Sequence, residues 1–356
     1  MSTELLALDS EAKAHADALY RDAIVIDGLL PSTVYLRDPD YRNDLAESGI
    51  TAGNFTVAHK HSFTEAVQLV QTVHRLMKEN PRKRIVRSAS DVREAKEGDE
   101  TGVIIGFQGA RPIGRQIDYL DAFYQMGVRI LQLTYNSQNY LGTGCWERED
   151  AGLTHFGRYA IDRMNELGML IDLSHCNDRT TMEAIEYSDD PVAFTHVAVR
   201  SIGHSHGRGK TDEQMRAIAD AGGLIGITFH PPFVKKDPDT HEVIPATIHD
   251  VLDHIDHVAE LVGPEHVSFG SDMNNRSYDT ETHLADFDER HMKLRAESAH
   301  VFSSSPPSDY VPVEGLHRTT KFENLAGGLL ERGYSDDEIS GILGGNFLRV
   351  FEQVVG

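Results

Sequence analysis

Eight short apolar runs recur along the chain, and their alternation with helix-like stretches constrains the fold more than any other feature. Most of the runs are continuous rather than alternating in polarity, which is typical of parallel strands buried on both faces. Segments of helical periodicity separate them. The runs are residues 24–28, 50–57, 102–107, 128–133, 169–173, 191–195, 223–229 and 266–270.

The segments between the runs carry helix signals of two kinds. Residues 118–126 have a short helical pattern, and residues 156–167 have a longer one that places one set of side chains on a single face. That set is Phe156, Tyr159, Ala160, Met164 and Leu167. Capping-box spacing starts two further helices, and a glycine pair follows each one. These signals are Thr211 with Gln214 before Gly222-Gly223, and Ser335 with Glu338 before Gly344-Gly345, where the last helix is expected to end.

Eight strands alternating with helices predict a (β/α)8 TIM barrel, formed by residues 1–356 as a single domain. A doubly wound open sheet is the alternative, but no Gly-x-Gly-x-x-Gly follows the first run. Residues 31–49 and 274–316 do not fit the period. The second of these segments contains Pro306-Pro307 after a serine run, and we interpret it as an insertion near the barrel mouth or at an oligomer contact.

Composition excludes several classes of partner. The formal net charge is -22, and an acidic surface repels both nucleic acid and anionic membranes. No apolar stretch reaches the roughly 18 residues that a transmembrane helix needs, and residues 1–18 lack the features of a secretory signal. Cys145 and Cys176 are the two cysteines of the chain, too few for a disulfide framework. A cytoplasmic location is therefore expected.

Three polar residues stand where a barrel keeps its chemistry, just past the carboxyl ends of strands. His175 follows the fifth run, His196 the sixth and Asp272 the eighth. Neutral imidazole is the commonest metal ligand, and two imidazoles with a carboxylate or a water suit zinc. One histidine among the 19 in this chain would indicate little. Two histidines at the ends of adjacent strands, together with an aspartate after the eighth strand, favour a metal site.

The order of these residues is that of the amidohydrolase superfamily, and the sequence around them resembles the membrane (renal) dipeptidase family, peptidase family M19. The resemblance covers about residues 22–275 and 315–355 and is most specific from 128 to 213. It is carried by Leu133-Thr134-Tyr135-Asn136, Gly152-Leu153-Thr154-His155-Phe156-Gly157, Met164-Asn165-Glu166-Leu167-Gly168-Met169, Asp172-Leu173-Ser174-His175, Thr195-His196, Arg208, Asp212-Glu213, Phe269-Gly270-Ser271-Asp272 and Gly344-Gly345-Asn346-Phe347.

The resemblance implies a (β/α)8 barrel with a two-zinc centre that hydrolyses dipeptides, some with a D-residue at the C-terminal position. Carried over by position, His175 and His196 would ligate one zinc ion. Asp272 would accept the proton of the attacking water. Arg208 would bind the substrate carboxylate, for which a planar bidentate donor is well suited.

The chain departs from the family pattern at three places. The family's first strand ends in Asp-Gly-His-Asn-Asp, whose histidine and second aspartate bind the other zinc, whereas this chain has Asp27-Gly28-Leu29-Leu30-Pro31. The bridging glutamate is replaced by Gln108, whose neutral amide balances no metal charge. The histidine that polarises the scissile carbonyl is replaced by Tyr135, which can still donate a hydrogen bond to an oxyanion. We therefore expect one zinc ion per chain and leave a second open.

Other residues near the strand ends are candidates for the substrate pocket. Gln108, His230 after the seventh run, and Glu147 in the loop after the fourth run are expected to contact the substrate. His59 and His61 have the spacing of a metal pair, although an ordinary loop is the alternative. His204 and His206 are either substrate contacts or solvated loop residues. Cys176 is expected to be buried and inert, because neighbours in an extended segment point apart.

Three functions remain open from the sequence. The first is a metal-dependent amidohydrolase with one zinc, acting on a dipeptide or small amide that bears a free carboxylate. The second is a lyase or isomerase of a small carboxylate on the same barrel, and the third is an inactive barrel used for binding. Cleavage of L,L- or L,D-dipeptides would separate the first from the others. The 274–316 segment and the habit of the family predict a homodimer.

Overall fold

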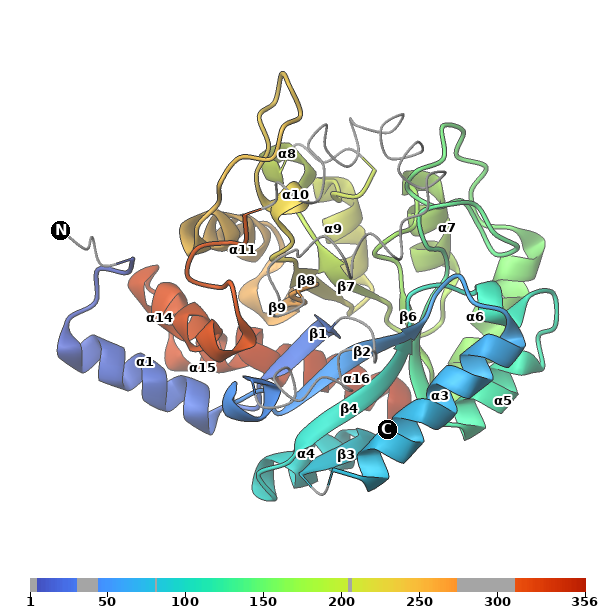
Figure 1. Cartoon of the computed structure of the whole chain (residues 1–356). Helices are drawn as coiled ribbons and strands as arrows, with labels where there is room; N and C mark the ends of the chain where they lie inside the picture. Colours follow the sequence, from blue (N-terminus) through green and yellow to red (C-terminus); the bar gives the residue numbers. More distant parts are fainter. Residues whose placement is uncertain (1–4, 31–43, 81, 204–206, 274–310) are drawn as a thin grey trace.

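All eight apolar runs form parallel strands around one barrel (Figure 1). The computed structural model describes residues 5–30, 44–80, 82–203, 207–273 and 311–356. Each strand of the barrel pairs with the one that follows it around the sheet. In that order the strands are β1 (Ile26–Leu30), β2 (Ala52–Ala58), β4 (Thr101–Phe107), β5 (Val128–Gln132), β6 (Leu170–Asp172), β7 (Ala193–Val197), β8 (Leu224–Ile227) and β9 (Val267–Phe269).

The last strand returns to the first through backbone and side-chain hydrogen bonds. The backbone N–H of Asp272 donates to the carbonyl oxygen of Leu29 at 3.0 Å. The backbone N–H of Ser271 donates to the buried carboxylate of Asp27 at 2.8 Å. These contacts close the sheet into a nearly complete barrel, so the predicted (β/α)8 fold is confirmed.

A ninth strand, β3 (Lys83–Val86), lies outside this path and pairs with β4 in parallel. Of its four residues, only Val86 is fully buried. The strand therefore has no continuous apolar run, and for this reason the sequence did not reveal it.

Helices connect the strands and surround the barrel (Figure 1). The predicted pattern at 118–126 forms α5, and the capping boxes at Thr211 and Ser335 are both present. The helices are α1 (Ser10–Asp22), α3 (Phe63–Lys78), α4 (Ala89–Glu97), α5 (Tyr119–Gln125), α6 (His155–Leu167), α7 (Asp178–Tyr187), α8 (Arg200–Gly203), α9 (Asp212–Asp220), α10 (Pro231–Val234), α11 (Ile248–Val262), α14 (Glu323–Glu331), α15 (Asp336–Ser340) and α16 (Asn346–Val355).

The face predicted for α6 is only partly right. Tyr159, expected among the packed side chains, is 65% exposed. The buried residues are Gly157, Ala160, Ile161 and Met164. The packed face is therefore turned by about one residue, because Gly157 lies directly against the backbone of Leu141, where a Cβ would come within 2.2 Å of the carbonyl oxygen.

The helix that starts after Ser335 is interrupted at Gly344, near its predicted end, but it is not the last helix, because α16 follows the kink. After α15 a π-helical turn runs through residues 341–345, with a kink at Gly344, and α16 follows. A Cβ on Gly344 would lie 2.4 Å from the carbonyl oxygen of Ile24, so glycine is required at this close approach.

Helix α16 seals the amino-terminal end of the barrel. One apolar cluster joins its side chains to residues near the start of the strands, so this end is filled and the opposite, carboxyl-terminal end is left for a site. From α16 the cluster contains Phe347, Leu348, Val350, Phe351 and Val354, and from the barrel strands it contains Ile26, Ala52, Ile104, Ile130, Leu170, Ala193 and Leu224. Val86, at the end of the outer strand β3, also belongs to it.

Of the two segments that did not fit the strand period, the structure describes residues 44–49 of the first and residues 311–316 of the second. Residues 274–310 of the expected insertion lie outside the described residues, as do Pro31, His204 and His206. At the end of that segment Val313 and Leu316 are buried, and Glu314 pairs with Thr247.

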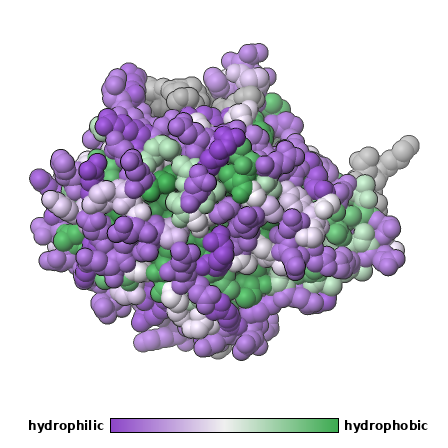
Figure 2. Space-filling model, turned by 180° about the vertical axis from the view of Figure 1, so that it is seen from behind, coloured by the Kyte–Doolittle hydropathy of each residue, from purple (hydrophilic) through white to green (hydrophobic). Residues whose placement is uncertain are grey.

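No helix in the described part of the chain is long and apolar enough to cross a bilayer. Figure 2 shows one face of the molecule, which is mostly hydrophilic with small hydrophobic patches.

Candidate metal centre

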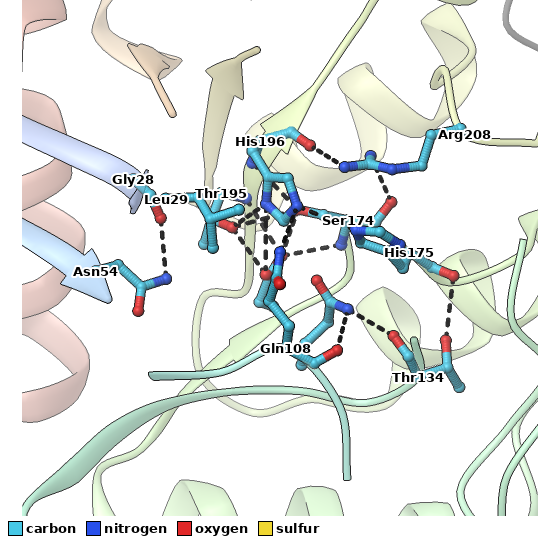
Figure 3. A network of polar contacts seen from close by, with 12 residues as sticks. Gly28, Leu29, Asn54, Gln108, Thr134, Ser174, His175, Thr195, His196 and Arg208 are labelled. Carbon is cyan, nitrogen blue, oxygen red and sulfur yellow. Dashed lines mark hydrogen bonds and ion pairs between the residues drawn. The ribbon is translucent and has the colours of Figure 1, made fainter. Parts of the chain in front are cut away.

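The two predicted histidines meet at the carboxyl end of the barrel (Figure 3). His175 follows β6 and His196 lies on β7, and both side chains are buried. Their Nε2 atoms are 3.1 Å apart. The strand ends thus bring together the residues that the sequence paired.

Hydrogen bonds behind the rings determine which nitrogen of each histidine carries the proton. The Nδ1 of His175 lies 2.6 Å from the Oδ1 of Asn136. That oxygen also accepts the thiol of Cys145, so the atom facing the ring is an acceptor. The Nδ1 of His196 lies 2.8 Å from the hydroxyl of Thr195, which itself donates to Asp172 at 2.7 Å. Both Nδ1 atoms are therefore donors, and both Nε2 atoms carry lone pairs.

Two lone pairs that face each other at 3.1 Å repel unless a positive charge lies between them. Burial, with a smaller contribution from the Arg208 charge, holds the pKa of both histidines well below the usual range, so a proton is disfavoured there. Tetrahedral zinc binds nitrogen at about 2.0–2.1 Å, which separates two ligand nitrogens by about 3.4 Å. The pair supplies two nitrogen ligands for a divalent ion, one fewer than the three protein ligands of a catalytic zinc site.

Neither this pair nor any other described cluster has a third His, Cys, Asp or Glu side chain placed to ligate a metal ion. At the end of β1 the apolar side chains of Leu29 and Leu30 are fully buried. The described residues thus supply a pair of imidazoles for one ion, with no carboxylate or thiolate beside them.

The side chain of Gln108 contacts the histidine pair at His196. Its amide nitrogen Nε2 lies 3.1 Å from the Nε2 of His196, and an amide N–H donated there engages the same single lone pair that a metal ion would use. Its backbone carbonyl accepts a hydrogen bond from the amide of Gln132 at 2.6 Å. Gln108 is thus held at the position from which a metal or a substrate would be approached.

Asp272 lies at the barrel mouth in a left-handed backbone conformation, with φ of 52°. Burial raises the pKa of its carboxyl group to about 7, and the nearby charge of Arg208 opposes this shift. A carboxyl group that titrates near neutral pH can act as a general base under physiological conditions.

Arg208 is fully buried beside the histidines. Its Nη1 donates to the carbonyl oxygen of Ser174 at 3.1 Å, and its Nη2 donates to that of His196 at 2.8 Å. The guanidinium also lies over the ring of Phe233, 4.9 Å from its centroid. Its buried Nε has no hydrogen-bond partner among the described residues. Arg208 therefore ties β6 to β7 and keeps N–H groups for a further acceptor.

Tyr135 stacks on His175, with ring centroids 4.6 Å apart. The ring of His59 also lies against Tyr135, with centroids 4.7 Å apart, and His61 follows at 5.2 Å from His59. The predicted pair His59 and His61 is therefore next to the site, in a row of rings that begins at the candidate metal-binding histidines.

The remaining candidates lie at the edge of this cluster. The carboxylate of Glu147 accepts the backbone N–H of Gln138 at 2.8 Å. His230 precedes α10, its ring lies 5.0 Å from that of Phe233, and its charge contributes to lowering the pKa of His196. Cys176 is buried, and burial raises the pKa of its thiol to about 11, as expected for an inert cysteine.

Asn136, Asp172, Ser174 and Thr195 also belong to the site, although the sequence did not single them out. They form the hydrogen bonds that orient the two histidines and join the ends of the strands that carry them. The sequence does contain a pattern that could have identified two of them. Asp172 and Ser174 are two residues apart in an extended segment and so share a face, and both interrupt an otherwise apolar run.

Comparisons with known proteins identify the family of the chain. The sequence model of the family described as "Membrane dipeptidase (Peptidase family M19)" matches residues 13–287 and 290–355. "Dipeptidase tcpJ" of Claviceps purpurea (strain 20.1) is 26% identical over 325 residues, which cover 90% of this chain and 65% of that protein. The chain thus spans slightly less than two thirds of that relative.

Among solved structures, an amidohydrolase from Pseudomonas aeruginosa is 33% identical, with a TM-score of 0.84, and the match covers 95% of this chain and 98% of that one. The probable dipeptidase PvdM from the same species shares the fold at 19% identity, with a TM-score of 0.79 and coverage of 98% and 99%. Since the family match extends over almost the whole chain, the protein belongs to the membrane dipeptidase family, peptidase family M19.

Proposed function

We propose that this protein is a metal-dependent amidohydrolase that cleaves a dipeptide or small amide bearing a free carboxylate, with one zinc ion held by His175 and His196. The observation that carries the proposal is the approach of two Nε2 lone pairs to 3.1 Å in a buried, uncharged pair. A structure of a family relative fits this substrate class. A metallo peptidase from Rhodobacter sphaeroides, 20% identical, was solved with a phosphinate mimic of the dipeptide L-Ala-D-Ala.

Each step of such a hydrolysis has a candidate residue near the pair. A bound zinc ion would lower the pKa of a coordinated water to about 7 and supply hydroxide. Asp272, whose pKa of about 7 suits a base, would accept the proton of the attacking water and deliver it to the leaving amine. Tyr135, stacked on His175, would donate a hydrogen bond to the developing oxyanion.

The substrate would be held by residues on the open side of the pair. Arg208 binds backbone carbonyls through two of its nitrogens, and its remaining N–H groups are suited to a carboxylate. Gln108 would contact the amide beside His196. His230 and Glu147 would form the rim of the pocket.

A non-hydrolytic enzyme, or a binding protein, is the alternative proposal. It is favoured by the apolar end of β1, where Leu29 and Leu30 are buried, and by the neutral amide of Gln108. A lyase or isomerase would use Asp272 and Arg208 without an attacking water, and would leave every dipeptide intact.

We further propose a homodimer with a small-molecule substrate. A cytoplasmic location agrees with the free, buried thiols of Cys145 and Cys176.

The proposal is tested first by metal content and then by cleavage. Plasma mass spectrometry should find about one zinc per chain in the wild type and none in the double variant His175→Ala with His196→Ala. The matched control, His249→Ala with His257→Ala, removes two half-buried histidines outside the site and should retain the metal.

Zinc-loaded protein should then cleave members of an L,L- and L,D-dipeptide panel. Bound zinc with no cleavage of any dipeptide or amide would support the alternative proposal. Protein that takes up no zinc would end the hydrolase proposal, and two ions per chain would assign ligand roles to further residues such as His59.

A further inference from the structure

Arg208 lies on an irregular segment, residues 207–210, whose last residue pairs with the chain just after β7. The backbone N–H of Lys210 donates to the carbonyl oxygen of Ala198 at 2.9 Å. The backbone N–H of Arg200 donates to the carbonyl oxygen of Lys210 at 3.0 Å. These bonds hold the backbone beyond Arg208, but they do not determine where its guanidinium group points.

The side chain of Arg200 ties this segment to the start of α7. Its Nη1 and Nη2 donate to the two carboxylate oxygens of Asp178 at 2.9 and 2.5 Å, and its Nε donates to the carbonyl oxygen of Gly209 at 2.9 Å. A two-pronged contact between a guanidinium and a carboxylate fixes the orientation of both groups. One planar group therefore connects the first residue of a barrel helix to the peptide next to Arg208.

The carboxylate of Asp178 is ionised at this position. Burial would raise its pKa, but the hydrogen bond and the charge of Arg200 outweigh burial, so the pKa lies below the usual range. Gln214 donates a further hydrogen bond to the same carboxylate at 3.1 Å. Because the Arg200 side chain is 18% exposed, water screens its contact with Asp178 less than it screens an ion pair on an open surface.

Lys210 anchors the same segment through a second cation. Its fully buried Nζ donates to the carbonyl oxygen of Cys176 at 2.7 Å and to the hydroxyl of Thr181 at 3.1 Å. Cys176 lies just before α7, and Thr181 lies in the first turn of that helix. The backbone that follows Arg208 is thus held to the start of α7 by two cationic side chains.

We propose that Arg200 is a positioning residue that, through Asp178 and the Gly209 carbonyl, holds Arg208 in the orientation that binds the carboxylate of the substrate. Two nitrogens of Arg208 donate to backbone carbonyls, and its buried Nε has no partner among the described residues. Without the Arg200 contact, a ligand would have to order the segment as it binds, and its affinity would fall. The inference rests on the proposed function for the ligand of Arg208, and it involves no metal ion.

The test is a double-mutant cycle on ligand binding by the full chain, stripped of metal with a chelator. The probes are L-Ala-D-Ala and the same dipeptide amidated at its C-terminus, and isothermal titration calorimetry gives the dissociation constants. Arg200→Gln removes the two-pronged contact. Arg332→Gln is the matched control, because Arg332 also bonds two carboxylates, those of Asp253 and Asp256, with a side chain that is 30% exposed and lies outside the site.

Arg200→Gln should weaken the binding of L-Ala-D-Ala about 10-fold, because a misplaced guanidinium loses its paired hydrogen bonds to the carboxylate. Arg332→Gln should stay within about twofold of the wild type. In an Arg208→Lys background, Arg200→Gln should cost less than about a further twofold, since residues that act through one another are not additive. Fully additive losses would overturn the inference, and so would an equal loss for the amidated dipeptide.

A second readout needs no ligand. Nitrogen-15 spectra of the arginine side chains should show a sharp Nε–H signal for Arg208 in the wild type and in Arg332→Gln, because this group is buried and fixed. Arg208→Lys identifies the signal by its loss. In Arg200→Gln the signal should broaden or shift, and an unchanged signal would overturn the inference.

The outcomes separate this inference from the proposed function. A wild-type protein that does not bind L-Ala-D-Ala contradicts the carboxylate-binding role proposed for Arg208, and the Arg208 signal then decides the positioning role alone. Thermal melting confirms that each variant folds. If Arg200→Gln does not fold, Asp178→Asn takes its place in the same cycle, because it keeps the shape of the carboxylate and removes its charge.

Discussion

Asp272 combines an unusual backbone conformation with a carboxyl group that titrates near neutral pH. Its φ of 52° is uncommon outside glycine, and burial raises its pKa to about 7. The backbone hydrogen bond to Leu29 holds this conformation at the point where the barrel closes. Such strain at a candidate base agrees with a catalytic role.

The first prediction concerns the protonation of Asp272. Because a general base acts only when ionised, kcat/KM should rise with pH through an apparent pKa of about 7. Asp272→Asn should lower kcat by about 100- to 10,000-fold and remove this limb of the profile. If the limb persists in the variant at reduced amplitude, the titrating group is a different one.

The second prediction concerns the carboxylate partner of Arg208. Arg208→Lys keeps the charge but loses the planar fork, so KM for a substrate with a free carboxylate should rise at least about 10-fold. The same substrate amidated at its C-terminus should bind weakly to the wild type, and the substitution should not weaken it further. An equal loss for both substrates would mean that Arg208 serves only to join the carbonyls of Ser174 and His196.

Residue types at strand ends could be predicted from the sequence, but their orientation could not. His175, His196 and Asp272 were placed correctly at the carboxyl ends of β6, β7 and β9 because the period of the strands fixes those ends. The tautomers depend on Asn136 and Thr195, which act through single hydrogen bonds. Side-chain distances of this kind arise from packing between strands that are distant in sequence.

At the scale of elements, the strands were predictable and the last helix was not. Continuous apolar runs identify buried parallel strands directly. The pair Gly344-Gly345 was interpreted as a stop, since glycine usually follows a helix. In the structure the glycine at the kink permits contact with the backbone of Ile24, and the chain continues into α16. The glycine signal thus marked a real break in the helix, and the helix that follows the break was not predicted.

The third prediction tests this close approach. Gly344→Ala places a methyl group 2.4 Å from the carbonyl oxygen of Ile24 and should lower the free energy of unfolding by about 1–3 kcal/mol. Gly345→Ala is the control, because its backbone is helical and its nearest neighbour, the Ser340 carbonyl oxygen, is at 3.2 Å. Urea denaturation measures both. If both variants have the same free energy of unfolding, α16 moves to accommodate the methyl group at no cost in stability, and the prediction is wrong.

For the whole molecule, the buried carboxyl groups of Asp27 and Asp272 make folding dependent on pH. Burial raises the pKa of each to about 7, against an ordinary value of 3.8. A raised pKa means that the folded state binds the proton more tightly than the unfolded state. Their contribution to stability is therefore complete below about pH 4 and is lost as pH rises through about 7.

The fourth prediction follows from that sign. The wild-type melting temperature should fall between about pH 5 and about pH 8, because Asp27 and Asp272 lose their protons in this range. The Asp27→Asn variant, in which one of the two groups no longer titrates, should show a shallower decline. The charge of Asp272 is the smallest of the causes that shift the pKa of Asp27, so the Asp27→Asn variant should remove mainly the contribution of Asp27 itself. Calorimetry of metal-free protein across this range measures the slope. A variant as steep as the wild type would place the responsible protons elsewhere.

The position of α16 has a consequence for how the protein is made. The helix that covers the amino ends of the strands consists of residues 346–355, and all eight barrel strands precede it along the chain. During synthesis, the apolar starts of those strands stay exposed until this helix emerges from the ribosome. A nascent chain that terminates before residue 346 should therefore aggregate or depend on chaperones, although it already carries every residue of the candidate metal centre.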